Sequence, residues 1–365
     1  MAGVELWITS VHVPGQAASM ARRAEADGFD GIGFGDTQNL AADPYIGLVL
    51  AAQATTALRL GIRVANPVTR DAATVAAAIA TVQVESGGRA VLGVGRGDSS
   101  VSHIAGRPAP LSALESYVGA LQGYLGGGWA VDAGAAPVRE GGRRVRPLGW
   151  LPPGLAKVPV DVAATGLRTM AVGARLAEDL TVNVGADPAR MSETVRTVRG
   201  LERPSSAPPL TLGAYVNVVP HPDRDVAREL VKGPAAAYAR LSGVAGGAAP
   251  GAEPGDRELL ENLVQNYDPK AHGRSGASHV VFLTDEFLSR FAVFGPPEEC
   301  VERLVALVGC GVGRLVIVGP AGDGDPDDAR RARHLLGREV VPGLREALAG
   351  TGAVDRPGAA EEARP

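Results

Sequence analysis

Two glycine-containing turns carry residue types that suit an anionic ligand. Gly95-Arg96-Gly97-Asp98 directly follows the apolar run Ala90–Val94, and Thr165-Gly166 follows the apolar run Pro159–Ala163. Glycine imposes no side chain, so the backbone N–H groups of such a turn can approach a ligand closely. Thr165-Gly166 also stands where a helix is expected to begin, and the free N–H groups and partial positive charge there favour an anion. An ordinary helix cap explains Thr165-Gly166 equally well.

Two carboxylates at or near expected strands could move protons. Asp36 comes directly after Ile32–Gly35, so we expect its side chain where that strand ends, at the mouth of the sheet. Glu5 lies inside the expected strand Val4–Ile8. A carboxylate that faces the interior must accept hydrogen bonds or have a raised pKa, whereas one that faces outward is a solvated edge residue. The pattern of the strand leaves both orientations of Glu5 open.

The elements that must position these residues are clearest over residues 58–100. Leu58–Ala65 is an expected strand, Asp71 can cap the Ala-rich helix that follows, and Ala90–Val94 is the next strand. Two buried strands joined by one helix form a βαβ unit, whose connection is almost always right-handed. Parallel α/β folds place their chemistry where such strands end. We therefore expect function just after Val64 and just after Val94.

Strand, loop, helix and glycine turn recur along the chain, and their count predicts an α/β fold of the (β/α)₈ TIM-barrel type. An open doubly wound sheet would need a reversal of strand order, which the sequence does not exclude. We expect one domain over residues 1–348, with insertions after strand 4 and strand 7 at about 126–158 and 242–277, and a disordered tail at 349–365. Both insertions are expected to cover the pocket. The expected strands are Val4–Ile8, Ile32–Gly35, Leu58–Ala65, Ala90–Val94, Pro159–Ala163, Asp179–Val184, Pro209–Val218 and Gly313–Val318.

Composition and charge exclude several classes of protein. The 365 residues have a formal net charge of −4 and no long basic run, so we expect no nucleic-acid partner. No apolar stretch approaches the roughly 20 residues of a membrane helix, and Met1–Ser10 lacks the pattern of a signal peptide, so we expect a cytoplasmic protein with no membrane partner. Cys300 and Cys310 lack the spacing of metal ligands, and we expect no metal site.

Residues 58–98, LRLGIRVANPVTRDAATVAAAIATVQVESGGRAVLGVGRGD, resemble the bacterial-luciferase-like flavin and deazaflavin oxidoreductases. The similarity is greatest to their methylenetetrahydromethanopterin-reductase branch, which uses coenzyme F420, and the stretches 24–36, 160–186 and 291–318 agree with it. The resemblance implies a TIM barrel, a homodimer, and a flavin or deazaflavin ring in the barrel mouth. It also implies a bulge at the end of the third strand, with a cis peptide bond between Arg63 and Val64. Arg63 departs from the small residue usual at that point.

The resemblance assigns roles to individual residues. Asp36 matches a position that contacts the deazaflavin, and Glu5 matches a buried glutamate proposed as the proton donor. The family often has Asp-His after the second strand, whereas this chain has Asp36-Thr37, so proton transfer falls to Glu5 or to a residue on the substrate side. The other implied cofactor positions are Arg63 and Val64 behind the ring, Gly95, Arg96 and Gly97 beside the cofactor's tail, and Ala164, Thr165 and Gly166 at its phosphate.

We therefore expect an F420-dependent oxidoreductase that transfers a hydride between the deazaflavin and a C=C, C=N or C=O bond of a small organic molecule. The same barrel mouth could hold FMN, so a monooxygenase that uses reduced FMN and oxygen is the alternative. A third hypothesis, from another class, is a barrel without cofactor that serves as a binding or structural partner. The intact turns Gly95–Asp98 and Thr165-Gly166 argue against it, because close approach of backbone to a ligand is what these glycines permit.

Overall fold

A computed structural model describes residues 3–104, 106–127, 139–140, 143–244 and 255–350. Nearly all of the tail predicted to be disordered, from residue 351 onward, lies outside these described residues. Within the described ranges, no helix is both long enough and apolar enough to cross a membrane.

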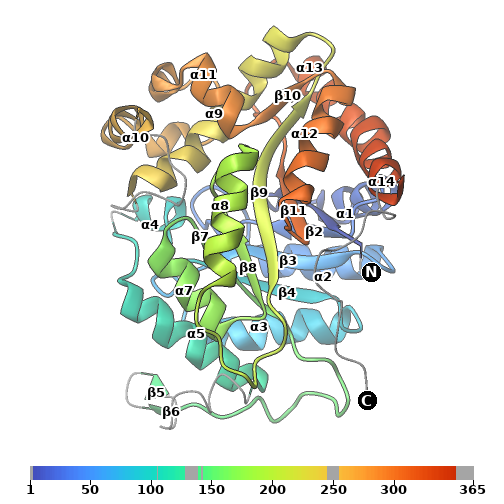
Figure 1. The fold of residues 1–365 in the computed structure, drawn as a ribbon. Helices are drawn as coiled ribbons and strands as arrows, with labels where there is room; N and C mark the ends of the chain where they lie inside the picture. The colour runs from blue at the N-terminus through green and yellow to red at the C-terminus, as the bar shows by residue number, and fades with distance from the viewer. Residues whose placement is uncertain (1–2, 105, 128–138, 141–142, 245–254, 351–365) are drawn as a thin grey trace, which may run out of the picture.

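Eight parallel strands close into a barrel, which confirms the predicted (β/α)₈ fold (Figure 1). Neighbouring strands pair in the order β9-β11-β1-β2-β3-β4-β7-β8, and β8 pairs with β9 to complete the ring. An open doubly wound sheet would leave two edges, so this closure excludes it. The barrel strands are β1 (Glu5–Ser10), β2 (Gly31–Phe34), β3 (Arg59–Ala65), β4 (Ala90–Val94), β7 (Val160–Ala164), β8 (Asp179–Val182), β9 (Thr211–Pro220) and β11 (Arg314–Val318).

Helices cover the outside of the barrel because the segments between the strands have apolar faces with local start and stop signals. Helix α3 (Ala72–Glu85) starts at Asp71, whose side chain accepts a hydrogen bond from the Ala73 N–H. Helix α5 (Leu111–Leu125) ends at Gly126, which has a left-handed backbone conformation. The other helices of this layer are α1 (Ala17–Ala26), α2 (Pro44–Ala54), α7 (Leu167–Leu176), α8 (Pro188–Arg199), α12 (Pro297–Gly309), α13 (Pro326–Leu335), the π-helical turn Leu336–Val340 and α14 (Val341–Gly350). The four-residue helix α4 (Ser99–Ser102) follows the turn after β4.

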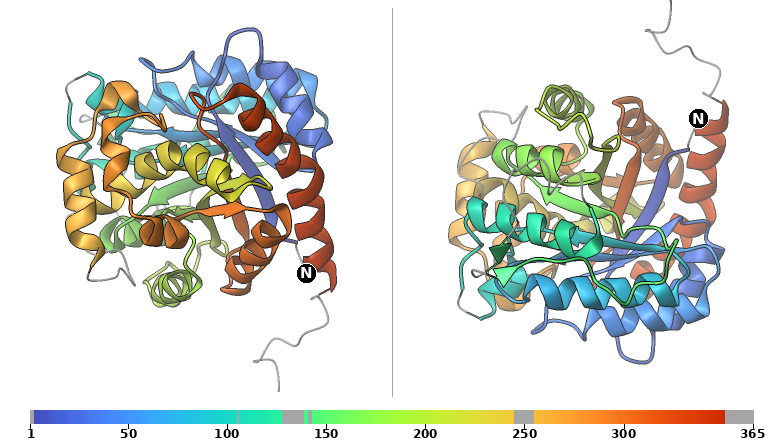
Figure 2. Two further views of the ribbon diagram at one scale, coloured as in Figure 1. Left: turned by 90° about the horizontal axis from the view of Figure 1, so that it is seen from above. Right: turned by 90° about the horizontal axis from the view of Figure 1, so that it is seen from below.

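The chain between β9 and β11 builds a second packed layer over the barrel. It contains α9 (Arg224–Val244), α10 (Asp256–Gln265), α11 (Asp285–Phe291) and β10 (Val293–Gly295), which pairs with the end of β9. These helices share a hydrophobic cluster of their own with Val219 and Phe294. Seen from above in Figure 2, this yellow-to-orange segment lies over the barrel. The two short 3₁₀ helices between α10 and α11 are Pro269–Ala271 and Ser278–Phe282.

The predicted insertion 126–158 lies elsewhere. Its described part includes an antiparallel pair of two-residue strands, β5 (Arg139–Glu140) and β6 (Arg143–Arg144). Figure 1 shows this pair at the end of the molecule opposite to α10 and α11. The two insertions therefore flank different ends of the barrel.

Candidate active site

A cavity of about 790 Å³ opens where the barrel strands end, which is within the usual size range of cofactor and small-molecule sites. The end of β1, the ends of β3 and β4, the turn after β7 and the helix α9 all contribute to its lining. The structure brings together in this cavity every residue that the sequence predicted for cofactor binding: Asp36, Arg63, Val64, Gly95, Arg96, Gly97, Ala164, Thr165 and Gly166.

The ends of β3 and β4 approach each other closely on one wall. The peptide bond between Arg63 and Val64 is cis, and the register of β3 against β4 shifts at the same point. A Cβ atom on Gly95 would lie 2.9 Å from Val64 Cγ2. Gly97 has φ = +86°, and a Cβ there would lie 2.5 Å from Val101 Cγ2. Both glycines of the turn are therefore required by its geometry.

The turn between β7 and α7 presents the start of a helix to the cavity. Gly166 is the N-cap residue of α7, and no side chain caps this helix. Thr165 and Gly166 both line the cavity. Because the first N–H groups of a helix have no partner within the helix, this turn suits a phosphate or another anion better than an ordinary side-chain-capped helix start would.

Asp36 is buried at the cavity and held by an arginine that the sequence analysis did not single out. Arg70 Nε donates to Asp36 Oδ2 at 2.8 Å, and Arg70 Nη2 donates to Asp36 Oδ1 at 3.1 Å. The same Nη2 donates to Asp43 Oδ2 at 2.8 Å. Burial raises the pKa of Asp36, and the hydrogen bonds and charge of Arg70 offset this only in part. Both oxygens of Asp36 thus have a fixed partner, which makes this carboxylate an anchor for the loop after β3.

Arg63 extends from the cavity into the barrel interior. Its Nη1 donates to Asp161, and its guanidinium lies 4.6 Å from the centroid of the Trp7 ring. Gly33 on β2 leaves room for Arg63 because it has no side chain. A Cβ atom at this position would lie 2.3 Å from Arg63 Cγ. Nε and Nη2 of Arg63 are buried and have no well-aligned partner among the described residues, but the guanidinium also contacts the Tyr215 hydroxyl, and Tyr215 lines the same cavity. Such donors beside a cavity suit an electron-rich oxygen of a ligand.

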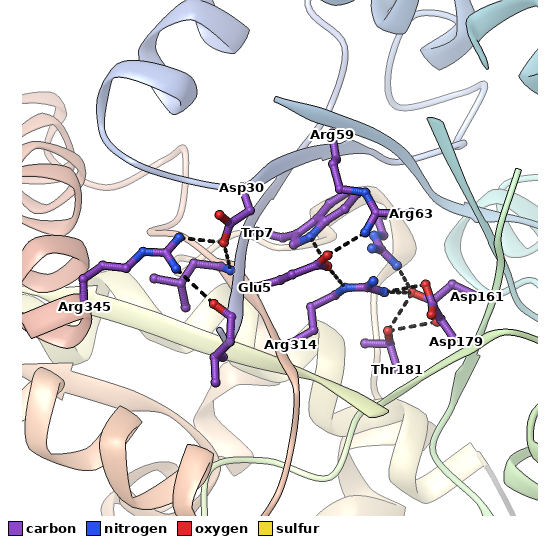
Figure 3. Close-up of polar contacts among 12 residues, drawn as sticks. Glu5, Trp7, Asp30, Arg59, Arg63, Asp161, Asp179, Thr181, Arg314 and Arg345 are labelled. Atoms are coloured by element: carbon purple, nitrogen blue, oxygen red, sulfur yellow. Dashed lines mark hydrogen bonds and ion pairs between the residues drawn. The ribbon is translucent and has the colours of Figure 1, made fainter. Parts of the chain in front are cut away.

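Arg63 belongs to a network of charged side chains that fills the barrel below the cavity (Figure 3). Arg314 Nη1 donates to Asp179 at 2.9 Å, and the Thr181 hydroxyl donates to Asp161 Oδ2 at 2.7 Å. Burial alone would raise the pKa of Asp161, but the charges of Arg63 and Arg314 hold it below its ordinary value. The positive and negative charges of the network balance: Arg59, Arg63 and Arg314 against Glu5, Asp161 and Asp179.

Glu5 lies at the far end of this network and away from the cavity, which corrects its predicted place beside the ring. It is the first residue of β1 and stands in register with Arg314, the first residue of β11. Arg314 Nε and Arg59 Nη1 each donate to it at 2.6 Å, and Trp7 Nε1 donates at 3.0 Å. The cavity is lined by the other end of β1, Ile8–Ser10. TIM barrels carry their chemistry at the carboxyl ends of the strands, so Glu5 serves as an ion-pair partner at the opposite face.

Helix α9 and the segment after α10 form another wall, built from residues that the sequence analysis missed. Arg240 on α9 forms an ion pair with Asp98, which joins α9 to the turn after β4. His272 lines the cavity, and the Tyr267 hydroxyl lies 2.6 Å from its Nδ1. The polar run NYDPKAH (266–272) was the signal available in the sequence. No described residue of 126–158 lines the cavity, so the expectation that both insertions cover the pocket is corrected.

The described residues contain no group of three or more His, Cys, Asp or Glu side chains that could hold a metal ion. Cys300 is buried and Cys310 half-buried, and both are free thiols.

Comparison with known proteins identifies the family of the chain. The family model described as luciferase-like monooxygenase matches residues 4–314, which run from the start of β1 to the start of β11. The chain belongs to this family. The predicted resemblance to luciferase-like oxidoreductases is thereby confirmed.

Curated and solved relatives of this luciferase-like protein are oxidoreductases. The 5,10-methylenetetrahydromethanopterin reductase of Methanolobus tindarius is 24% identical over 332 residues, which cover 89% of this chain and 95% of the relative. The solved coenzyme F420-dependent tetrahydromethanopterin reductase of Methanopyrus kandleri has a TM-score of 0.68 at 22% identity, covering 94% of this chain and 100% of its own. An F420-dependent secondary alcohol dehydrogenase in complex with an F420-acetone adduct has a TM-score of 0.67 at 18% identity, covering 94% and 99%. These structures share the fold of this chain.

Proposed function

We propose that this luciferase-like protein is an F420-dependent oxidoreductase that transfers a hydride between the deazaflavin and a small organic substrate. The observation that carries the proposal is the single cavity at which the end of β3, the turn Gly95–Gly97 and the uncapped start of α7 meet. The names of the curated relatives, which are reductases, and of the F420-dependent enzymes with the same fold support the deazaflavin over other cofactors.

The residues present fit such a cofactor. Gly95 packs so closely against Val64 that a Cβ atom on Gly95 would lie 2.9 Å from Val64 Cγ2. A tightly packed wall of this kind is what we expect of a surface against which a flat ring packs. Thr165 and the first N–H groups of α7 would hold the phosphate. Arg63, with Tyr215 beside it, would bind an electron-rich oxygen of the ring or of the substrate. When bound, the reduced deazaflavin supplies a hydride, and the protein positions and desolvates the substrate for it.

The alternative is a monooxygenase that uses reduced FMN and oxygen, which the description of the matching family favours. Titration of the purified protein with F420 and with FMN, followed by quenching of each cofactor's fluorescence, separates the two. We expect saturable binding of F420 that is at least about 10-fold tighter than binding of FMN, a difference of about 1.4 kcal/mol. Tighter binding of FMN, with oxygen consumption in its reduced form, would favour the monooxygenase. Binding of neither would revive the cofactor-less barrel.

We also propose that the protein is a homodimer that works in the cytoplasm as one domain over residues 1–348. Helix α2 carries an exposed apolar pair, Ile46 with 61% and Leu50 with 41% of its surface accessible. The two positions are four residues apart and so lie on the same face of the helix. A second copy of the chain is the partner that this apolar face would meet.

A further inference from the structure

A chain of polar side chains joins Asp98 to His272, which both line the cavity, through Arg240 on α9 and Tyr267 after α10. Arg240, itself 8% exposed, pairs with Asp98 at one end. Its guanidinium lies 4.2 Å from the centroid of the Tyr267 ring. The Tyr267 hydroxyl lies 2.6 Å from Nδ1 of His272, which lines the cavity. No part of the cofactor site described above requires this chain.

The hydrogen bonds along the chain fix the tautomer of His272. Burial raises the pKa of the Tyr267 hydroxyl, so its proton stays in place at neutral pH, and the positive charge of Arg240 offsets this only in part. A phenol is a much stronger acid than the N–H of a neutral imidazole, so in this contact the Tyr267 hydroxyl donates and Nδ1 of His272 accepts. Nδ1 then accepts, and the ring proton of neutral His272 resides on Nε2, the nitrogen left for a ligand.

His272 is neutral over the whole physiological range. Burial, together with the positive charge of Arg240 and the nearby rings of His103 and His279, lowers its pKa to about 4. A neutral imidazole held in the Nε2–H tautomer is a hydrogen-bond donor toward the cavity at any pH above about 5. The residue after Asp36 is Thr37, which is not an acid–base group, and His272 reaches the same cavity from a different segment, after α10.

We infer that His272 is the catalytic hydrogen-bond and proton donor to the oxygen of a carbonyl substrate, with Tyr267 and Arg240 as its positioning residues. This inference rests on the proposed hydride-transfer function and narrows its substrate class to aldehydes and ketones, or in reverse to alcohols. A C=C or C=N substrate without an acceptor oxygen would leave the Nε2–H unused.

The step balances with reduced deazaflavin as the hydride donor. The hydride forms a new C–H bond at the carbonyl carbon, and the π electron pair of C=O moves to the oxygen. The oxygen takes the Nε2 proton of His272, and Nδ1 takes the hydroxyl proton of Tyr267. An alkoxide is a stronger base than a phenolate, so this transfer runs downhill. The resting state returns when Nε2 takes a proton from water, which leaves hydroxide, and Nδ1 gives its proton back to the Tyr267 phenolate. The products are the alcohol and the oxidised deazaflavin.

The tautomer can be tested without cofactor or substrate. Histidine-ring nitrogen NMR on the isotope-labelled full-length protein resolves six histidines, and the His272→Gln variant assigns the signal of His272. We expect a neutral Nε2–H ring that titrates near pH 4. In Tyr267→Phe, which loses the donor to Nδ1, the signal should shift toward a mixture of tautomers. A Nδ1–H ring in the wild type would overturn the inference, whether or not the protein binds F420.

The role in turnover is tested with reduced F420 and a panel of ketones from acetone to cyclohexanone. We expect His272→Gln to lower kcat about 100-fold, as for removal of a general acid, while F420 affinity stays that of the wild type. Tyr267→Phe should lower kcat about 10-fold, the cost of one lost hydrogen bond, and His334→Gln on the exposed face of α13 should change nothing. Undiminished ketone reduction by His272→Gln would overturn the inference. F420 binding without any ketone reduction by the wild type would overturn it and leave the proposed function standing.

Discussion

Arg63 shows how one residue type can change the interior of a barrel. A guanidinium at the base of the cavity has to be neutralised in the core, and Asp161 does this from β7. Arg314 also touches Asp161, at 3.3 Å, and continues the network to Asp179. The sequence named Arg63 as a departure from its relatives, but it offered no means of finding Asp161, because 98 residues separate the two.

The first prediction concerns the stability of this buried pair. Arg63→Met leaves Asp161 with Arg314 and Thr181 as partners but gives the network an unbalanced negative charge, which should lower the free energy of unfolding by about 3 kcal/mol. Asp161→Asn should cost a similar amount for the opposite reason. The double variant restores the charge balance, so its loss of unfolding free energy should be smaller than the sum of the losses of the two single variants. Urea unfolding of all four proteins measures the cycle, and simple additivity would show that the two side chains are not coupled.

The second prediction follows from the place of Glu5. Its three hydrogen-bond partners lie at the amino ends of the strands, and the cavity begins at the other end of β1. Glu5→Gln should therefore leave F420 binding and kcat within about twofold of the wild type, while it destabilises the fold by about 1–2 kcal/mol through the weakened contacts of Arg314. Fluorescence titration and thermal unfolding check both parts. A loss of kcat at unchanged stability would return Glu5 to the active site.

At the scale of elements, the sequence predicted best where local signals agree. Helix Leu111–Leu125 and strand Ala90–Val94 have the predicted bounds, because each is an apolar segment closed by glycine. The first strand was predicted to end at Ile8, but it runs to Ser10. The polar residues Thr9 and Ser10 resemble a loop in sequence, whereas in the barrel they line the cavity.

The candidate site likewise has parts that local sequence signals located and a part that they did not. The turns after β4 and β7 each depend on a few neighbouring residues, so motif and resemblance located them. The wall with Arg240, Tyr267 and His272 depends on the packing of α9 and α10 over the barrel. That packing is a contact between distant segments, since Arg240 and Asp98 are 142 residues apart. No local pattern in the chain encodes it.

The third prediction concerns the turn after β4. Gly95→Ala places a methyl group 2.9 Å from Val64 Cγ2, so either the turn or the end of β3 must move away from the cofactor surface. We expect F420 affinity to fall at least about 10-fold, the effect of losing about 1.4 kcal/mol of contact. Gly149→Ala is the matched control, because nothing lies within 4 Å of its Cβ position and neither glycine has a positive φ. Unchanged affinity in Gly95→Ala would remove this wall from the cofactor site.

The fourth prediction concerns Glu178, which ties α5 to the start of β7. Its carboxylate accepts hydrogen bonds from Gln122 Nε2 at 3.0 Å and from the Val160 N–H at 2.9 Å, and it lies 2.8 Å from Lys157 Nζ. Burial would raise the pKa of Glu178, but Lys157 and these hydrogen bonds lower it below 4.5. A carboxylate whose pKa is depressed by folding stabilises the protein above its unfolded pKa and loses that contribution as the pH falls through the folded pKa.

Glu178→Gln should therefore be less stable than the wild type at pH 7, and the difference should shrink as the pH falls below about 4.5. Urea unfolding at a series of pH values measures it, and Glu302→Gln on α12, for which no such partners exist among the described residues, is the control. Other carboxylates bend the wild-type curve as well, since burial raises the pKa of Asp36, Asp98 and Asp179. The difference between the two proteins isolates Glu178. A difference that grew in acid would contradict the assigned direction.

At the scale of the whole molecule, the residues of the ionic network and the residues that line the cavity lie toward opposite ends of the barrel. The amino ends of the strands carry the balanced ionic network, and the carboxyl ends carry the cavity, with Arg63 as the residue common to both (Figure 3). The α9–α11 segment lies over the cavity end and is joined to the barrel by Arg240–Asp98 and by the hydrogen bond from Asn183 Nδ2 to the Tyr238 carbonyl at 2.9 Å. Residues of this segment, among them His272, therefore contribute to the lining of the cavity.

The last prediction concerns the proposed homodimer. Ile46 and Leu50 give α2 an exposed apolar pair, and a symmetric dimer through α2 would bury both from each copy. We expect light scattering after size-exclusion chromatography to give about twice the chain mass of 37.3 kDa, and Ile46→Glu to shift the protein toward the monomer because it would bury an unpaired charge. Val281→Glu, at a residue that is 75% exposed but lies in the α9–α11 layer and not on α2, should leave the mass unchanged. A wild-type monomer would contradict the dimer, and a dimer that survives Ile46→Glu would move the interface away from α2.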